Sequence, residues 1–161
     1  MLTAQYTASN MEAMMAFGTA LSPHLRACDV VALRGDLGAG KTTLARGLIR
    51  AYCEVNEVSS PTFPIVQCYD GPRGRLWHFD AYRLEDPVEI WEIGLEDALT
   101  DGVSVIEWPE RLGDIIPEER LDVSIKIVGS ARVITIVATK EWSSRWQLLA
   151  RMPGIGVSGD L

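Results

Sequence analysis

Eight consecutive residues, 35–42, match the pattern G-x-x-x-x-G-K-[ST] that is typical of phosphate-binding loops. An apolar, strand-like run at residues 30–33 precedes the pattern, and a segment of helical composition at residues 43–50 follows it. In this context, consecutive backbone amides and the positive end of the helix dipole together hold phosphate oxygens. The sequence therefore predicts that the chain binds a nucleoside triphosphate.

Two side chains of this loop carry the specific chemistry. We expect Lys41 to reach the β and γ phosphates and the Thr42 hydroxyl to ligate Mg²⁺. The amide-lined turn ahead of the lysine is expected to cradle the other phosphate oxygens. Its residues are Leu37, Gly38, Ala39 and Gly40.

Two carboxylates stand where such a site needs a metal ligand or a group that orients water. Asp80 follows the apolar run 76–79, and Glu107 follows the apolar run 103–106. Because the carboxyl ends of strands open the ligand crevice of α/β sheets, both acids are candidates for these roles. Each can equally cap the turn after its strand. Thr62, on an extended loop, is expected either to sense the γ phosphate in a switch-like way or to close a local turn.

Length and composition limit the classes of protein that fit. The chain has 161 residues, a length that suits a single domain. Its formal net charge of −7 does not suit binding to nucleic acid by neutralisation of phosphates. RNA is therefore expected to be held by partners. No apolar run approaches the length of a bilayer span, and three widely spaced cysteines favour reduced thiols. We expect a soluble, cytoplasmic protein.

The elements that must position these residues follow from periodicity and capping signals. Strands alternate with helices around the loop, which predicts an α/β, P-loop NTPase-like domain with three layers and a mixed, largely parallel sheet. Ser9 and Glu12 form a capping box for the first helix. Trp142, Trp146 and Leu149 form a stripe that favours core packing over a docking face. The other expected elements are an edge strand at 2–7, hairpins within 65–79 and 121–137, helices at 88–93, 95–99 and 140–151, and a disordered tail from about residue 153.

Five sequence blocks between about residues 10 and 140 resemble the TsaE (YjeE) family, the small ATPases needed for bacterial threonylcarbamoyladenosine modification of tRNA. They stand in the family's order and at its spacing. The H-x-D-x-Y-R-L block and the E-W-P-E block together are the most specific part of the resemblance. The five blocks are residues 35–43, 60–63, 78–84, 94–97 and 106–110.

This resemblance implies ATP hydrolysis with Mg²⁺, coupled to a complex with the TsaD and TsaB proteins that carry out threonylcarbamoyl transfer. By matching position it assigns Thr43 to the phosphate loop and Thr62 to a switch-like segment. It assigns Asp80 to hydrolysis and Glu107 to the metal, and it places Trp108 beside the nucleotide or a partner surface. Which of the two acids orients the attacking water stays open.

The resemblance also implies where the nucleotide base is held, near the first helix and a late loop. In this sequence those positions point to Met11 and Arg132. The resemblance implies that Lys41 binds the phosphates and also takes part in catalysis.

Two other functions share the phosphate loop. A small-molecule kinase needs an arginine-rich lid, but residues 116–128 contain only Arg120 and Lys126 as basic residues. A guanine-nucleotide switch needs a D-x-x-G motif and a base-reading [NT]-K-x-D motif, and the sequence has neither. The ATPase is therefore the favoured function and the kinase is the alternative.

Overall fold

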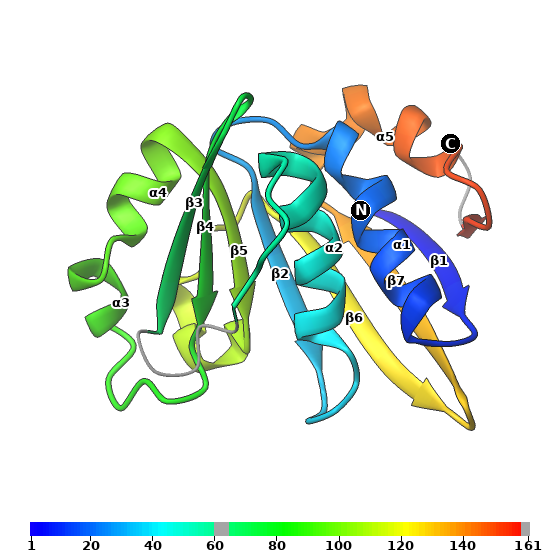
Figure 1. The fold of residues 1–161 in the computed structure, drawn as a ribbon, viewed down its shortest axis with the longest axis horizontal. Coiled ribbons are helices and arrows are strands. Elements are labelled where there is room, and N and C mark those ends of the chain that lie inside the picture. The colour runs from blue at the N-terminus through cyan, green and yellow to red at the C-terminus, as the bar shows by residue number, and fades with distance from the viewer. Residues whose placement is uncertain (60–64, 159–161) are drawn as a thin grey trace.

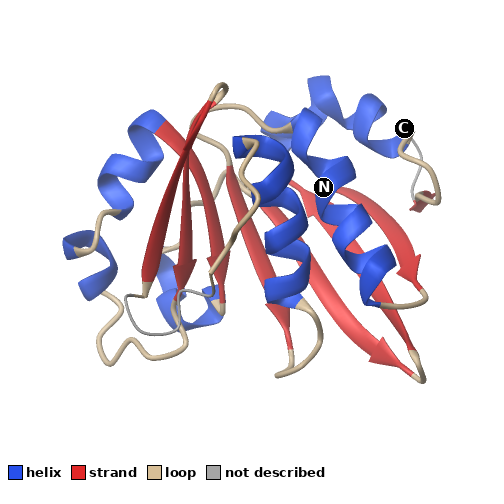
Figure 2. Cartoon of the chain, viewed as in Figure 1, coloured by secondary structure: helices blue, strands red, loops and turns tan. Residues whose placement is uncertain are grey.

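The computed structural model describes residues 1–59 and 65–158. Its strands form one continuous twisted sheet with helices packed against it (Figure 2). The strands are β1 (Leu2–Ala8), β2 (Val30–Gly35), β3 (Val66–Gly71), β4 (Gly74–Asp80), β5 (Gly102–Glu107), β6 (Leu121–Val128), β7 (Ala131–Ala138) and β8 (Gly156–Ser158). The α-helices are α1 (Met11–Leu21), α2 (Lys41–Cys53), α3 (Glu89–Glu92), α4 (Leu95–Asp101) and α5 (Ser143–Ala150), and short 3₁₀ helices cover Ser22–His24, Pro109–Ile115 and Lys140–Trp142.

The sheet has the strand order β3-β4-β5-β2-β6-β7-β1-β8. Its centre is parallel, because β4 pairs with β5, β5 with β2 and β2 with β6 in the same direction. The outer pairs are antiparallel. Strands β1, β2, β4, β5 and β6 therefore share one direction, and the predicted mixed α/β sheet is confirmed.

Two hydrophobic clusters lie on opposite faces of this sheet. Helices α1 and α2 lie side by side over one face (Figure 1), where Leu33 and Val105 belong to the larger cluster. Helices α3 and α4 cover the other face beside β4 and β5, where Val30 and Ile106 belong to the smaller cluster. Alternation along each strand separates the two sets. Three layers are therefore present around β4, β5 and β2.

Beyond β2 the second face of the sheet is more open. Asp122, Ser124 and Thr135 on this face are half-buried, and Gln5 is exposed. These polar side chains alternate with buried apolar ones such as Ile136, which is the pattern of an antiparallel sheet with one solvated face. The third layer thus covers the half of the sheet that carries the strand-end acids.

Several local predictions were wrong. Strand β1 is not an edge strand, because it pairs with both β7 and β8. Within the tail predicted to be disordered, Gly156–Ser158 form strand β8, which pairs with β1. The first helix is capped by Asn10 instead of Ser9: the Asn10 side chain accepts a hydrogen bond from the Ala13 amide at 2.8 Å. Strand β1 continues to Ala8, and the extended residue that enters the helix is therefore Asn10.

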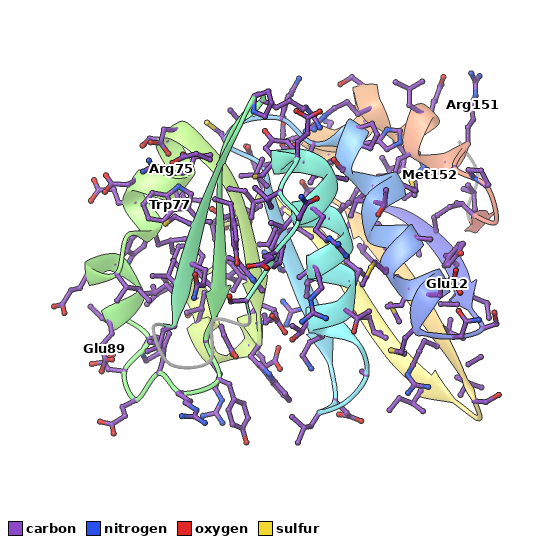
Figure 3. The ribbon with its side chains drawn as sticks, in the orientation of Figure 1. Glu12, Arg75, Trp77, Glu89, Arg151 and Met152 are labelled. Atoms are coloured by element: carbon purple, nitrogen blue, oxygen red, sulfur yellow. The ribbon has the colours of Figure 1, made fainter. Side chains whose placement is uncertain are left out.

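Aromatic side chains fill both clusters. Trp142 and Trp146 are buried in the larger cluster, which confirms the predicted core role of the tryptophan stripe. Trp77 projects from β4 toward α4 (Figure 3) and stacks on Phe79 with ring centroids 6.2 Å apart. Within the described residues, no helix is long and apolar enough to span a bilayer.

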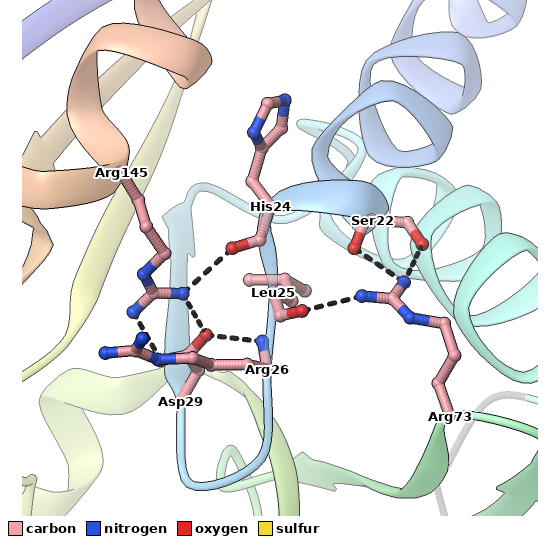
Figure 4. Close-up of polar contacts among 7 residues, drawn as sticks. All are labelled: Ser22, His24, Leu25, Arg26, Asp29, Arg73 and Arg145. Atoms are coloured by element: carbon pink, nitrogen blue, oxygen red, sulfur yellow. Dashed lines mark hydrogen bonds and ion pairs between the residues drawn. The ribbon is translucent and has the colours of Figure 1, made fainter.

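Two arginines tie distant segments together at the amino end of the central strands (Figure 4). Arg73, in the β3–β4 turn, donates hydrogen bonds to the backbone oxygens of Ser22 at 3.0 Å and Leu25 at 2.7 Å. Arg145, on α5, forms a two-pronged ion pair with Asp29, the residue before β2. These bonds fix the segment that leads into the phosphate loop strand.

Candidate functional site

The phosphate loop runs from the end of β2 to the first turn of α2. Gly40, the residue before the helix, has φ 112° and ψ 18°, a conformation that side chains with a Cβ rarely adopt. A Cβ built there would also lie 3.3 Å from Met14. Glycine at this position therefore lets the loop close tightly and lets α2 begin directly at the lysine, as the motif predicts.

Lys41 lies at the bottom of the loop and is 5% exposed. Its ammonium group donates hydrogen bonds to the backbone oxygens of Gly35 and Asp36, the latter at 3.0 Å. The Trp108 ring covers it, with the Nζ atom 4.0 Å from the ring centroid. Burial lowers the pKa of Lys41, and the nearby carboxylates oppose this shift. Among the described residues, two backbone oxygens accept from this ammonium group, which leaves its third hydrogen able to face a phosphate oxygen.

Thr42, Glu107 and His78 form a continuous hydrogen-bonded chain. The Thr42 hydroxyl donates to Oε1 of Glu107 at 2.9 Å, and Nε2 of His78 lies 2.6 Å from Oε2 of Glu107. Glu107 is 3% exposed and His78 is 0% exposed. The two residues predicted to hold Mg²⁺, one on α2 and one on β5, are thus in direct contact.

Asp80 stands beside Glu107 at the ends of two parallel strands, where the two residues are register partners. Its side chain accepts a hydrogen bond from the Tyr82 amide at 3.0 Å. Burial raises the pKa of Asp80, and the negative charge of Glu107 adds to this shift. Asp80 therefore both closes the turn and faces the loop, so the two alternatives open for it are compatible.

A cleft of about 280 Å³ connects these groups. It brings together the loop and both strand-end acids, which the sequence could only place on separate elements. The lining residues are Leu37, Gly38, Gly40, Lys41, Thr42, Thr43, Asp80, Glu107 and Trp108.

The two residues that the family pattern relates to the base lie beside the loop. Arg132, at the start of β7, donates through Nε to the backbone oxygen of Ala39 at 3.1 Å. The Met11 side chain approaches Gly40, since a Cβ built there would lie 3.6 Å from the Met11 methyl group. Thr62 lies outside the described residues.

The oxygen donors in this cleft fit Mg²⁺. A hydroxyl and a carboxylate are typical protein ligands of this ion, which takes its other ligands from phosphate and water. The described residues contain no group of three or more His, Cys, Asp or Glu side chains able to hold a metal alone. One hydroxyl and one carboxylate would leave the rest of the coordination sphere of Mg²⁺ to phosphate oxygens and water.

The sequence did not predict the contact between His78 and Glu107 or the position of the Trp108 ring over Lys41. The signal for His78 was present: it lies two residues before Asp80 on an apolar strand, so strand alternation places both on one face. Trp108 has φ 57°, an unusual backbone conformation for a bulky residue, which turns the chain sharply after Glu107. Nothing in the residue pattern predicts that conformation.

Comparisons with known proteins identify the family of this chain. The family model described as "Threonylcarbamoyl adenosine biosynthesis protein TsaE" matches residues 8–134. The tRNA threonylcarbamoyladenosine biosynthesis protein TsaE of Rickettsia bellii is 37% identical over 129 residues, which are 80% of this chain and 90% of that protein. The Haemophilus influenzae protein of the same name is 40% identical over 119 residues, 73% of this chain and 75% of that protein.

A solved structure extends the comparison to the fold. The crystal structure of Bacillus subtilis YdiB superposes with a TM-score of 0.77 at 27% sequence identity. The match covers 94% of this chain and 97% of the other. The family match spans the loop, both strand-end acids and His78. The chain therefore belongs to the TsaE family of tRNA threonylcarbamoyladenosine biosynthesis proteins.

Proposed function

We propose that this protein is the ATP-binding and ATP-hydrolysing subunit of the tRNA threonylcarbamoyladenosine pathway. The observation that carries the proposal is the Lys41 loop. It lines one cleft together with the Thr42 hydroxyl and the Glu107 carboxylate, which are hydrogen-bonded to each other. The family membership supplies the pathway. Mg²⁺–ATP is the proposed ligand, because the cleft offers amides and an ammonium for phosphates and two oxygen donors for the ion.

The residues divide the work by position. The loop amides and the ammonium group of Lys41 would bind the phosphates. Thr42 with Glu107 would hold Mg²⁺, which would supply neutralisation of the phosphate charge. Asp80 is the second carboxylate at the cleft, and in this proposal it would orient the attacking water while Glu107 holds the metal. The ring of Trp108 excludes solvent from the ammonium group of Lys41.

TsaD and TsaB are the proposed partners, and the cytoplasm is the proposed compartment. The net charge of −7 supports indirect contact with tRNA, because a chain of this charge gains little from the phosphate backbone. Hydrolysis is expected to be slow in the isolated chain and faster with both partners. A kinase lid finds no support at Arg120, whose guanidinium donates to Pro117 and Asp122 at the start of β6.

Titration with a fluorescent ATP analogue tests the binding step. Lys41→Ala is expected to abolish detectable binding and turnover, while Lys126→Ala, an exposed lysine on β6, is expected to leave both unchanged. Turnover is then measured alone and with TsaD and TsaB. Equal affinity in Lys41→Ala and the wild type would refute nucleotide binding by this loop. Fast hydrolysis that the partners do not alter would refute the proposed coupling.

A further inference from the structure

We infer that His78 is a positioning residue that holds Glu107 in the orientation needed by the Mg²⁺–ATP site, a role that rests on the proposed function. Both oxygens of the Glu107 carboxylate are engaged. Oε1 accepts from the Thr42 hydroxyl at 2.9 Å, and Oε2 accepts from Nε2–H of His78 at 2.6 Å. The two donors come from different elements, the helix α2 and the strand β4.

The sheet register creates this contact. Strands β4 and β5 are parallel, with His78 beside Val105 and Asp80 beside Glu107. His78 therefore lies one alternation step behind Glu107 on the same face, where its ring can reach the carboxylate. The last torsion of a glutamate side chain is broad and nearly two-fold, so a single donor leaves the carboxylate free to turn. A second donor on the other oxygen fixes its plane.

Core packing alone does not account for a histidine at this position. His78 is 0% exposed, and its Nδ1 has no hydrogen-bond partner among the described residues. Burying an imidazole costs free energy that an aliphatic side chain would not incur. Within the described part of the chain, the hydrogen bond to Glu107 is the polar interaction that offsets this cost. The contact with the Glu107 carboxylate, and not the filling of core volume, therefore explains the His78 ring at this position.

Loss of the His78 contact is expected to affect the affinity for Mg²⁺ more than the metal-independent affinity for the nucleotide. Outer hydrogen-bond partners of metal ligands typically change metal affinity or activity by about 10- to 100-fold when they are removed. Among the described residues, the Lys41 ammonium group bonds to Gly35 and Asp36 and the His78 ring bonds to Glu107, so the proposed phosphate-binding groups do not depend on His78. Loss of His78 should therefore weaken the Mg²⁺-dependent part of nucleotide binding and leave the metal-independent part intact.

Three variants separate positioning from packing. His78→Leu removes the donor, His78→Gln retains an N–H near the position of Nε2, and Phe79→Leu perturbs the next residue, whose buried ring faces the opposite cluster. Affinity for a fluorescent ATP analogue is measured in EDTA and across a Mg²⁺ titration, with melting temperature recorded for each variant. His78→Leu is expected to need about 10- to 100-fold more Mg²⁺ with unchanged affinity in EDTA. His78→Gln should recover most of the Mg²⁺ response, and Phe79→Leu should retain the wild-type response despite a lower melting temperature.

An equal loss of Mg²⁺ response in Phe79→Leu, or none in His78→Leu, would overturn the inference. A second readout needs no nucleotide: the Nε2–H proton of His78 should give a slowly exchanging imidazole resonance by NMR that disappears in Glu107→Ala. Absence of this resonance in the wild type would also overturn the inference. If the wild type shows no Mg²⁺-dependent binding of the analogue, the proposed function fails instead, and the resonance still decides whether His78 holds Glu107.

Discussion

The ion pair between Arg145 and Asp29 offers a quantitative test of how the fold is held together. Arg145 donates to the two Asp29 oxygens at 2.6 Å and 2.8 Å and to the backbone oxygen of His24 at 2.8 Å. The Arg145 side chain is 15% exposed and that of Asp29 is 9% exposed. The guanidinium carbon also lies 3.8 Å from the Trp142 ring centroid. Arg145→Met removes the charge and the donors while keeping an unbranched stem.

The expected cost follows from burial. Removing one partner of a buried ion pair costs about 3–5 kcal/mol, because the other charge is left without compensation. Asp29 keeps one hydrogen bond, from the Arg26 amide at 2.7 Å, and the pair retains some solvent contact. We therefore expect a loss of about 2–3 kcal/mol in the free energy of unfolding. For a chain of this length that corresponds to a melting temperature lower by roughly 4–12 °C.

Far-UV circular dichroism during thermal and urea unfolding measures the loss. The matched control is Arg75→Met, which removes a two-pronged pair with Asp70 whose side chains are 43% and 72% exposed. An exposed pair of this kind is expected to contribute about 0–1 kcal/mol. If Arg145→Met destabilises the protein no more than Arg75→Met does, burial does not set the strength of these pairs and the reasoning is refuted.

Three further outcomes are expected. Cys53, whose thiol pKa is raised by burial to about 11, should alkylate after the exposed Cys28 and Cys68, as followed by mass spectrometry; simultaneous labelling would contradict the buried position. Asp80→Asn should raise the melting temperature at neutral pH in EDTA, because burial raises the pKa of Asp80 and the fold then favours its neutral form. This gain should vanish below the ordinary aspartate pKa of 3.8, and a pH-independent difference would contradict it. Gly40→Ala should lose nucleotide affinity and about 1–2 kcal/mol of stability, since φ is 112° there; wild-type affinity in the same titration would contradict the loop geometry.

The phosphate loop was predictable because its geometry is local. Its amides come from adjacent residues, and Gly38 and Gly40 supply the positive φ angles that other residues resist. The strand-end acids were predictable for a related reason, since an apolar run followed by an acid indicates where a buried strand meets solvent. In both cases the information lies within a few residues of the functional group.

The parts that could not be predicted depend on contacts across the chain. Arg145 and Asp29 are 116 positions apart, and no spacing rule joins them. The interior position of β1 depends on β8, a three-residue strand too short to give a periodic signal. The first helix shows the limit at short range: Ser9 and Asn10 both suit a cap, and the length of β1 decides between them.

In the candidate site, the register of the parallel strands brings together residues that lie far apart in the sequence. Glu107 lies beside Asp80 on β4, so β4 and β5 end at one level, and it lies beside Leu33 on β2, which continues to Gly35. A shift of β5 by one residue would turn Glu107 away from Thr42 and His78 and bury it against the α3–α4 cluster. The exchange of Val105 and Ile106 between two apolar clusters would cost little, but Glu107 would lose both of its donors and lie as an unpaired charge among apolar side chains. The hydrogen bonds of the carboxylate therefore help to set the register of the strand that carries it.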